Sequence, residues 1–416
     1  MSTLLKGVKV IELGLILPGA ALGNLLADQG AEVIKVEPPP NGDYIRYFPE
    51  QVGTVDGHSF WHLVLNRNKK SVAVDLRTDE GRAILHDLVR GADVFITNLI
   101  AGQPERLGAG YRALRAIKPD LVYCQVTGFG ATGPYAILPS HGLAMASITG
   151  QCVLAPDARG WLRIVQDPAF GGGPQCAGQP VQTGPLWAAF GIANALYRRA
   201  VSGEGAYIDV SNCEATLATA WVGLPAALNP GRLNVAATSN SLESAKHAFY
   251  PTRDGKHVFV ALLEPKFWAK FCKVVGRDDL LAGLETDVKA FDRLDPEMNE
   301  VHHRELMALF QTRTRDEWRD LFVAHDLPCS PVNTAAELGE DPQLRARGAF
   351  VDVEHPVAGS FRMAAEPLQV RGQPRPVPAP APAPGQHTND VLAGLGYSRE
   401  RIGELERRGI VSSAKA

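Results

Sequence analysis

The sequence lacks the marks of a disulfide-bonded, metal-binding or membrane-spanning protein. Its six cysteines stand singly, with no Cys-x-x-Cys pair and no histidine at metal-ligand spacing beside them, so neither a disulfide framework nor a zinc site is expected. The adjacent residues His302 and His303 would point in different directions on a helix, which favours a solvated helix face. No run of 18 apolar residues occurs, and the first residues have no signal-peptide shape. We therefore expect a cytoplasmic protein that does not span a membrane.

The chain also has no large excess of either positive or negative charge. The chain has 42 Lys and Arg against 45 Asp and Glu, a net charge of −3, and no five-residue basic block. A protein that binds the backbone of nucleic acids is thereby disfavoured. Of the 416 residues, 45% are hydrophobic and 21% charged, which is enough apolar surface for a globular protein of two or more domains.

Strand-like and helical segments alternate along the first part of the chain. The expected strands are 8–13, 32–37, 71–76, 94–96, 121–126 and 207–210, and the expected helices are 18–29, 79–90, 111–117 and 186–199. This alternation predicts a mostly parallel sheet with helices on both faces. The turn after the first strand reads Leu15-Ile16-Leu17-Pro18-Gly19 and not G-x-G-x-x-G, which disfavours dinucleotide binding.

The second part of the chain has a different pattern of expected strands and helices. Beyond about residue 225 we expect a smaller α/β domain, with a strand at 256–263 and helices at 265–275, 304–311 and 315–325. Proline then occupies every second position from 374 to 384, which excludes a helix and predicts an extended strap over the surface. Short helices at 389–395 and 399–408 must dock to be stable, so the chain is expected to return to the first domain.

Three loops have compositions suited to chemistry. The basic loop Asn66–Lys70 either binds phosphates or is a solvated surface. The glycine-rich loop Gly128–Tyr135 follows a strand and therefore lies at the carboxyl edge of the sheet, where open α/β sheets place their ligands. His141 lies before a helix expected to start near Leu143, where it would be a neutral base or a structural residue.

Five motifs, in this order, resemble the class III CoA-transferase family, which includes formyl-CoA transferase, carnitine CoA-transferase and α-methylacyl-CoA racemase. They are Leu5–Leu13, Leu25–Glu37, Asn66–Leu76, Gly128–Tyr135 and Gly203–Ser211. Leu263–Trp268 and Ser140–Gly142 are most similar to the racemase branch. The similarity extends through Pro384–Thr388 and the C-terminal helices, and so covers essentially the whole chain.

The resemblance implies a Rossmann-like large domain with a parallel sheet, a smaller α/β domain, and an interlocked dimer of ring-shaped chains. Residues 1–224 would form the first part of the large domain, 225–332 the small domain, and 333–416 the return to the large domain. A CoA thioester would be the substrate, together with a carboxylic acid, and no cofactor would be tightly bound.

The resemblance also implies site residues. The nucleotide would be lined by Val74, Asp75, Leu76 and Arg77, phosphates or ribose would meet Asn98 and Arg106, and the thioester would face Ser140, His141, Gly142, Leu143, Ala144 and Met145. Pro38-Pro39-Pro40 replaces a cation that often follows the second strand, so the phosphate contacts are expected from residues such as Arg46 or Lys69.

One departure concerns catalysis. Transferases of this family use an aspartate as nucleophile, and the racemase uses the matching aspartate opposite its histidine for proton transfer. That aspartate should fall within Gln179-Pro180-Val181-Gln182, where no residue can attack a carbonyl. Between His141 and Arg199 the acids are Asp157 and Asp167, and Asp167 can take over only if the following residues loop out.

Three interpretations follow, of which the first is favoured. The chain is the aspartate-deficient subunit of a heteromeric CoA-transferase, paired with a paralogue that carries the aspartate. Alternatively it is an active homodimeric transferase or acyl-CoA isomerase, with His141 as base and Glu264 or Asp167 assisting. In the third interpretation it binds a CoA thioester without catalysis. Aromatic residues near the site would suit an apolar acyl group, although each is better explained as core: Phe129, Phe170, Trp187 and Trp221.

Overall fold

The computed structural model describes residues 4–48, 53–165, 178–221, 223–229, 232, 244–281 and 296–414. The chain divides into two compact units, Met1–Leu224 with Gly348–Ala416 and Pro225–Arg347, and each unit is described by itself. Residues 333–347, predicted to belong to the large domain, are part of the second unit. There Glu337 lies 2.8 Å from the Lys256 ammonium and 3.0 Å from the Arg315 guanidinium. Within the described residues, no helix is both long enough and apolar enough to cross a membrane.

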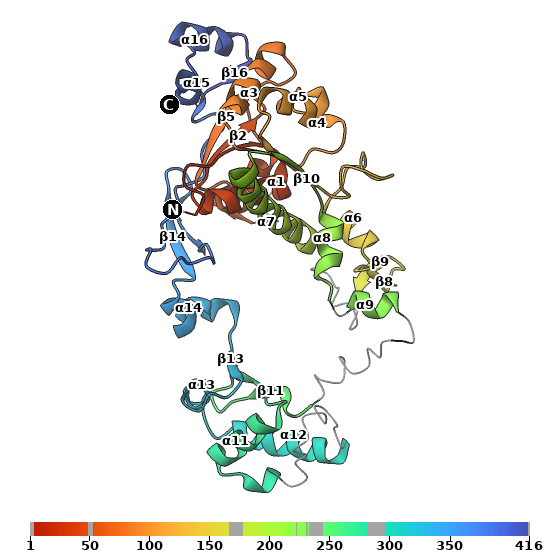
Figure 1. The fold of residues 1–416 in the computed structure, drawn as a ribbon. Helices are drawn as coiled ribbons and strands as arrows, with labels where there is room; N and C mark the ends of the chain where they lie inside the picture. Colours follow the sequence, from red (N-terminus) through yellow and green to blue (C-terminus); the bar gives the residue numbers. More distant parts are fainter. Residues whose placement is uncertain are drawn as a thin grey trace. The chain divides into compact units, whose positions relative to one another are not determined.

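A seven-stranded sheet forms the centre of the first unit, with strand order β10-β7-β6-β1-β2-β5-β16. Its strands are β1 (Lys9–Leu13), β2 (Glu32–Glu37), β5 (Lys69–Val74), β6 (Val94–Thr97), β7 (Val122–Thr127), β10 (Ala206–Ser211) and β16 (Val411–Ser412). Figure 1 labels β2, β5, β10 and β16 of this sheet. All neighbours are parallel except β16, which pairs antiparallel with β5. The order reverses between β1 and β6, because β2 and β5 follow on one side of β1 and β6, β7 and β10 on the other. That reversal opens a crevice at the carboxyl ends of β1 and β6.

Helices cover both faces of this sheet. One face packs on α3 (Asp79–Arg90), α5 (Tyr111–Ile117), α15 (Thr388–Gly394) and α16 (Arg399–Arg407), and the other on α1 (Ile16–Asp28) and α7 (Gly178–Ser202). Neighbouring residues of a strand serve opposite cores: Val10 packs with α1 and α7, and Ile11 packs with α3 and α16. The predicted parallel-rich sheet with helices on both faces is confirmed, and the C-terminal helices α15 and α16 pack on one of these faces.

The proline-rich segment 374–384 contains neither helix nor strand, as its composition predicted. Asn68 ties it down: its N–H donates to the Ala379 carbonyl at 3.1 Å, and its Oδ1 accepts from the Ala379 N–H at 2.7 Å. Asn68 has a φ of +62°, in the left-handed region that asparagine tolerates better than most residues. The basic loop at 66–70 therefore anchors this strap.

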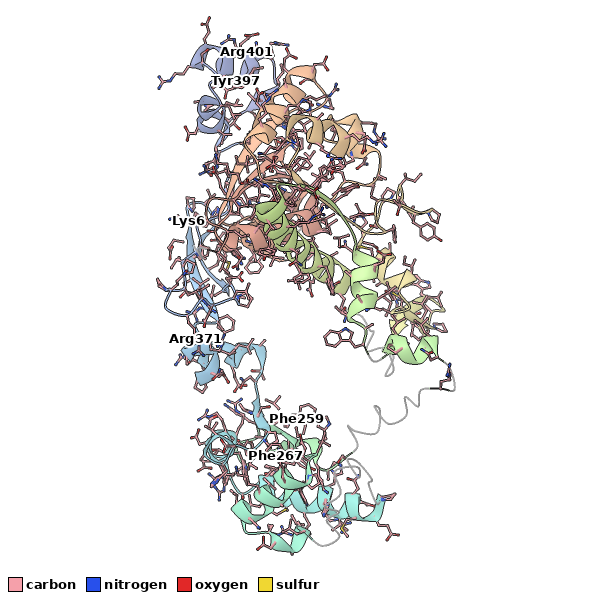
Figure 2. The ribbon with its side chains drawn as sticks, viewed as in Figure 1. Lys6, Phe259, Phe267, Arg371, Tyr397 and Arg401 are labelled. Carbon is pink, nitrogen blue, oxygen red and sulfur yellow. The ribbon has the colours of Figure 1, made fainter. Side chains whose placement is uncertain are left out.

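The second unit has its own core. An antiparallel sheet of β11 (His247–Pro251), β12 (His257–Ala261) and β13 (Cys329–Val332) packs with α11 (Pro265–Val275), α12 (Pro296–Phe310) and α13 (Arg315–Ala324). Phe259 and Phe267, labelled in Figure 2, mark β12 and α11. Trp268, Phe310 and Trp318 are almost fully buried between the helices and the sheet.

The remaining described elements are short. They are the helices α2 (Phe60–Leu65), α4 (Gln103–Arg106), α6 (Gly142–Ile148), α8 (Asn212–Thr219), α9 (Gly223–Leu228) and α14 (Pro342–Ala346), the 3-10 turns at 44–47, 278–281 and 335–340, and the strand pairs β3–β4 (54–55, 58–59), β8–β9 (153–156, 162–165) and β14–β15 (350–355, 359–364). The two longer strand pairs were not predicted. Their strands are only half covered, so the apolar pattern in the sequence is weak.

Candidate functional site

A cavity of about 210 Å³ lies at the point where the strand order reverses. Its walls come from the residues that follow β1, β6 and β7 and from α6, α7 and α8. The lining residues are Leu15, Ile16, Leu17, Pro18, Asn98, Leu99, Ile100, Gln103, Val126, Thr127, Gly128, Pro139, Ser140, His141, Gly142, Met145, Val181 and Asn212. This is where a doubly wound sheet is expected to bind its ligand.

Side-chain hydrogen bonds fix the backbone of Leu15 and Ile16, which form the cavity wall after β1. The Leu15 N–H donates to Asn98 Oδ1 at 2.8 Å, and Asn98 Nδ2 donates back to the Leu15 carbonyl at 2.7 Å. The Ile16 N–H donates to both carboxylate oxygens of Asp43, at 3.0 and 3.1 Å. Gly19 permits this tight turn, because a Cβ there would lie 2.9 Å from the Gly14 Cα.

Two buried polar side chains of the cavity have atoms without a hydrogen-bond partner among the described residues. These atoms are Thr127 Oγ1 and Asn212 Oδ1, on side chains whose residues are only 3% and 1% exposed. The other end of the Asn212 amide donates weakly to Met145 Sδ at 3.5 Å. Leaving such atoms unsatisfied costs roughly 1–3 kcal/mol each. Both residues line the cavity, and Asn212 Oδ1 itself lies against α7, where a Cβ at Gly184 would come within 1.6 Å of it.

The chemically active groups of the lining are Ser140 and His141. His141 is the N-cap residue of α6, and its side chain makes no capping hydrogen bond. Ser140 Oγ sits so close to Gly128 that a Cβ at Gly128 would lie 2.0 Å from it, so glycine is needed there. Among the described residues that line the cavity there is no carboxylate, and α7 contributes Val181. Gln179, two residues earlier, accepts a hydrogen bond from the Gln151 amide.

The structure brings five of the predicted site residues together on this cavity, namely Asn98, Ser140, His141, Gly142 and Met145. Seven others do not line it: Val74, Asp75, Leu76, Arg77, Arg106, Leu143 and Ala144. Val74 and Leu76 are buried, Asp75 and Arg77 pair with each other at 2.7 Å, and the remaining three are exposed. Their predicted contacts with a nucleotide, phosphate or thioester stay predictions.

The two acids expected to assist His141 are Glu264 and Asp167. Glu264 belongs to the second unit, where it is the N-cap residue of α11 and its carbonyl accepts from the Phe267 and Trp268 N–H groups. Its side chain makes no capping hydrogen bond. Asp167 lies outside the described residues, as does Phe170. The proposed assistance of His141 by either acid therefore stays a prediction.

Arg46 and Lys69 were expected to reach phosphates, and that expectation is wrong. The Lys69 ammonium is fully buried 2.8 Å from Glu12 Oε2, and Arg46 pairs with Glu37 at 2.5 Å. Burial, only partly offset by Glu12, lowers the pKa of Lys69 to about 8. Burial alone would raise the pKa of Glu37, but the Arg46 guanidinium, together with Lys35 and the Ser71 hydroxyl, outweighs it and the pKa falls to about 2. Both cations are structural.

The aromatic residues were also misjudged. Trp187 and Trp221 are exposed, at 43% and 81%, and are not core residues; neither lines the cavity. Phe129 is half-buried and packs edge-on against Tyr135 at 5.7 Å between ring centroids. Nothing in the cavity lining therefore ties these rings to an acyl group.

Sequence reasoning missed Ile16, Asp43, Thr127 and Asn212. A signal did exist for two of them: Thr127 ends β7 and Asn212 directly follows β10, so both are polar residues at the carboxyl edge of a predicted parallel sheet. Ile16 and Asp43 carried no such signal, because an apolar residue in a turn and an acid in a loop are ordinary on their own.

Comparison with known proteins agrees with this architecture. The model of CoA-transferase family III matches residues 5–388. The chain is 30% identical over 98% of both chains to "Succinyl-CoA--D-citramalate CoA-transferase" of Chloroflexus aurantiacus, and 32% identical to "Succinate--glutarate CoA-transferase" of Agrobacterium fabrum over 94% of this chain and 95% of that one. Among solved structures, a CAIB/BAIF family protein from Brucella suis is 28% identical, with a TM-score of 0.69 over 95% of this chain and all of the other. The chain belongs to CoA-transferase family III, the transferase family predicted from its motifs.

Proposed function

We propose that the chain binds a CoA thioester in the cavity at the strand-order reversal and takes part in CoA transfer between carboxylic acids as the subunit that lacks the nucleophilic aspartate. The relatives named above are CoA-transferases for dicarboxylic acids, which supports the reaction class. The observation that carries the proposal is the composition of the cavity: it offers Ser140, His141 and orphaned polar atoms but no carboxylate among its described lining residues.

The absence of a carboxylate from the described lining residues supports this role. Transfer through an enzyme-bound anhydride needs a carboxylate that attacks the thioester carbon. The segment expected to supply it presents Val181, and the amide of Gln182 is too weak a nucleophile at neutral pH. A second, aspartate-bearing chain would provide the nucleophile in an interlocked dimer, while this chain contributes walls and binding groups.

His141 supports a second candidate, an isomerase or transferase activity of the chain by itself. Its imidazole lies on the cavity beside Ser140 and can take the proton next to a thioester carbonyl. Racemisation also needs an acid that returns a proton to the opposite face of the substrate carbon, and the described lining offers none. Exchange of this proton with solvent is therefore expected without racemisation.

Expression of the chain alone and together with an aspartate-bearing paralogue separates these candidates. Each preparation is incubated with succinyl-CoA and a panel of free acids in deuterated buffer, and both new thioesters and deuterium incorporation are measured. The proposal predicts CoA binding by either preparation and transfer only by the pair. Transfer by the lone chain would contradict it.

The variant His141→Ala tests the second candidate. Loss of deuterium exchange, with CoA binding retained, would assign the base to His141. The matched control is His325→Ala, an exposed histidine of the second unit that should leave exchange unaltered.

A further inference from the structure

Six charged side chains next to α1 are linked by ion pairs and by one hydrogen bond from the Asp43 N–H to Glu37; they are called the buried charge network below. They are Glu12, Lys35, Glu37, Asp43, Arg46 and Lys69. Three are cations and three are anions, so the network as a whole is neutral. Lys35 is central: its ammonium lies 2.8 Å from Glu12 Oε1 and 2.9 Å from Asp43 Oδ2, and its side chain is 1% exposed.

This network meets the ligand cavity at Ile16. The Ile16 N–H donates to both oxygens of Asp43, and Ile16 itself has a φ of +58°. A left-handed conformation is unfavourable for any residue with a Cβ and especially for a β-branched one. The surrounding structure must therefore hold Ile16 in this conformation, and the Asp43 carboxylate does so by accepting the Ile16 N–H.

Asp43 is itself immobilised. Its own N–H donates to Glu37 Oε2 at 2.8 Å, and its Oδ1 also accepts from the Ile45 N–H at 3.1 Å. Lys35, besides pairing with Asp43, donates to the carbonyl of Gly14 at 2.8 Å. Gly14, Leu15 and Ile16 are thus fixed in succession by Lys35, Asn98 and Asp43.

We infer that Asp43 is a positioning residue for the ligand cavity: its carboxylate, fixed by Lys35, holds Ile16 in the left-handed conformation and so places the wall formed by Leu15, Ile16, Leu17 and Pro18. The consequence for a ligand rests on the proposed function, namely that this cavity binds a CoA thioester. Asp43 touches no ligand itself and acts through the backbone of Ile16.

The variant Asp43→Asn removes this hold without removing bulk. Each oxygen of Asp43 faces a donor, Oδ1 toward the Ile45 N–H and Oδ2 toward the Lys35 ammonium. An amide group would therefore point its NH₂ at a donor in either orientation. We expect the Kd for acetyl-CoA, used as the probe and measured by calorimetry, to rise about tenfold.

A double-mutant cycle with Ile16→Gly tests the mechanism. Glycine adopts the left-handed conformation without strain, so the carboxylate is no longer needed to impose it. In the Ile16→Gly background, Asp43→Asn should change the Kd by less than about twofold. An equal effect of Asp43→Asn in both backgrounds would overturn the proposal.

Asp28→Asn is the matched control. Asp28 is another buried carboxylate of the first unit, 2.5 Å from the Arg67 guanidinium, and it is not among the cavity residues. It should lower thermal stability about as much as Asp43→Asn and leave the Kd for acetyl-CoA unaltered. A rise in Kd equal to that of Asp43→Asn would show that general destabilisation is the cause, and would refute the positioning role.

Hydrogen exchange separates this proposal from the proposed function. In the unmodified, ligand-free protein the Ile16 amide should be strongly protected by Asp43, and Asp43→Asn should remove that protection. This readout needs no CoA, so it stands if the cavity binds another ligand, and it needs no variant if Asp43→Asn fails to fold. Rapid exchange of the Ile16 amide in the unmodified protein would refute the positioning role.

Discussion

Two regions of the same sheet, on either side of β1, are built in opposite ways. On the side of β2 and β5, the buried charge network pairs every cation with an anion. On the side of β6 and β7, the described lining of the cavity contains no Asp, Glu, Lys or Arg. It contains His141 and two residues, Thr127 and Asn212, that each have a polar atom without a hydrogen-bond partner. The six charged residues of the network thus serve as scaffold, whereas the cavity keeps polar atoms that have no partner among the described residues.

The difference has a physical origin. Buried charges are tolerated only when they are paired and hydrogen-bonded, so a network of this kind cannot give up a member to a ligand. An unsatisfied neutral polar group costs less free energy than an unpaired buried charge, so it can remain without a partner until a ligand binds. Thr127 and Asn212, unlike Lys69 and Arg46, are therefore not committed to a partner through their unsatisfied atoms.

Removing the central cation should have the largest effect. Lys35→Met leaves Glu12 and Asp43 buried without their common partner, and breaking a buried pair typically costs about 3–5 kcal/mol. The free energy of unfolding is measured by urea denaturation. The control Arg159→Met breaks an exposed pair with Asp157 in the same unit and should barely shift the urea midpoint. Similar shifts for both variants would erase the distinction between scaffold and surface charges.

Acid should weaken the network through Glu37. Its pKa falls from the ordinary 4.5 to about 2 in the folded protein, so the unfolded chain takes up a proton first as pH drops. The stabilisation is complete above about pH 4.5 and is lost as the pH falls toward 2, on the order of 3 kcal/mol in total.

The variant Glu37→Gln checks this sign. It should be less stable than the unmodified protein at pH 7, and the gap in unfolding free energy should narrow between pH 5 and pH 3. A gap that stays constant over this range would show that Glu37 does not carry the acid sensitivity.

Substitution of a cavity residue should have the smallest effect on the free energy of unfolding. Asn212→Leu removes a buried amide whose oxygen has no partner, so the free energy of unfolding should change by less than about 1 kcal/mol. Affinity for a CoA thioester should nevertheless fall, because the ligand loses a hydrogen-bonding group. Thermal unfolding and calorimetry measure the two effects.

Asn98→Leu provides the contrast on the same cavity. Both ends of the Asn98 amide are bonded to Leu15, so its loss should lower stability clearly more than the loss of Asn212. Equal destabilisation by the two variants would contradict the interpretation that the Asn212 amide oxygen has no hydrogen-bond partner in the ligand-free protein.

Much of the fold was predictable because its signals are local. The apolar pattern located the strands around Val10, Val33, Val122 and Ile208 within a residue or two, and the helix expected at 79–90 matches α3. His141 was recognised from its place before a helix, and Asn98 from the family resemblance. The sequence by itself therefore determined the element order, the parallel sheet, the family and part of the cavity, since periodicity, caps and motifs act over a few neighbouring residues.

Only the tertiary structure decided what the charges do. Lys35, Lys69 and Arg46 look like surface cations in the sequence, and their burial depends on Glu12, Asp43 and Glu37, which other strands and loops bring to them. The left-handed Ile16 is likewise held by a carboxylate 27 residues away. Pairing energies and backbone strain arise from contacts between distant segments, and no local pattern of residues encodes them.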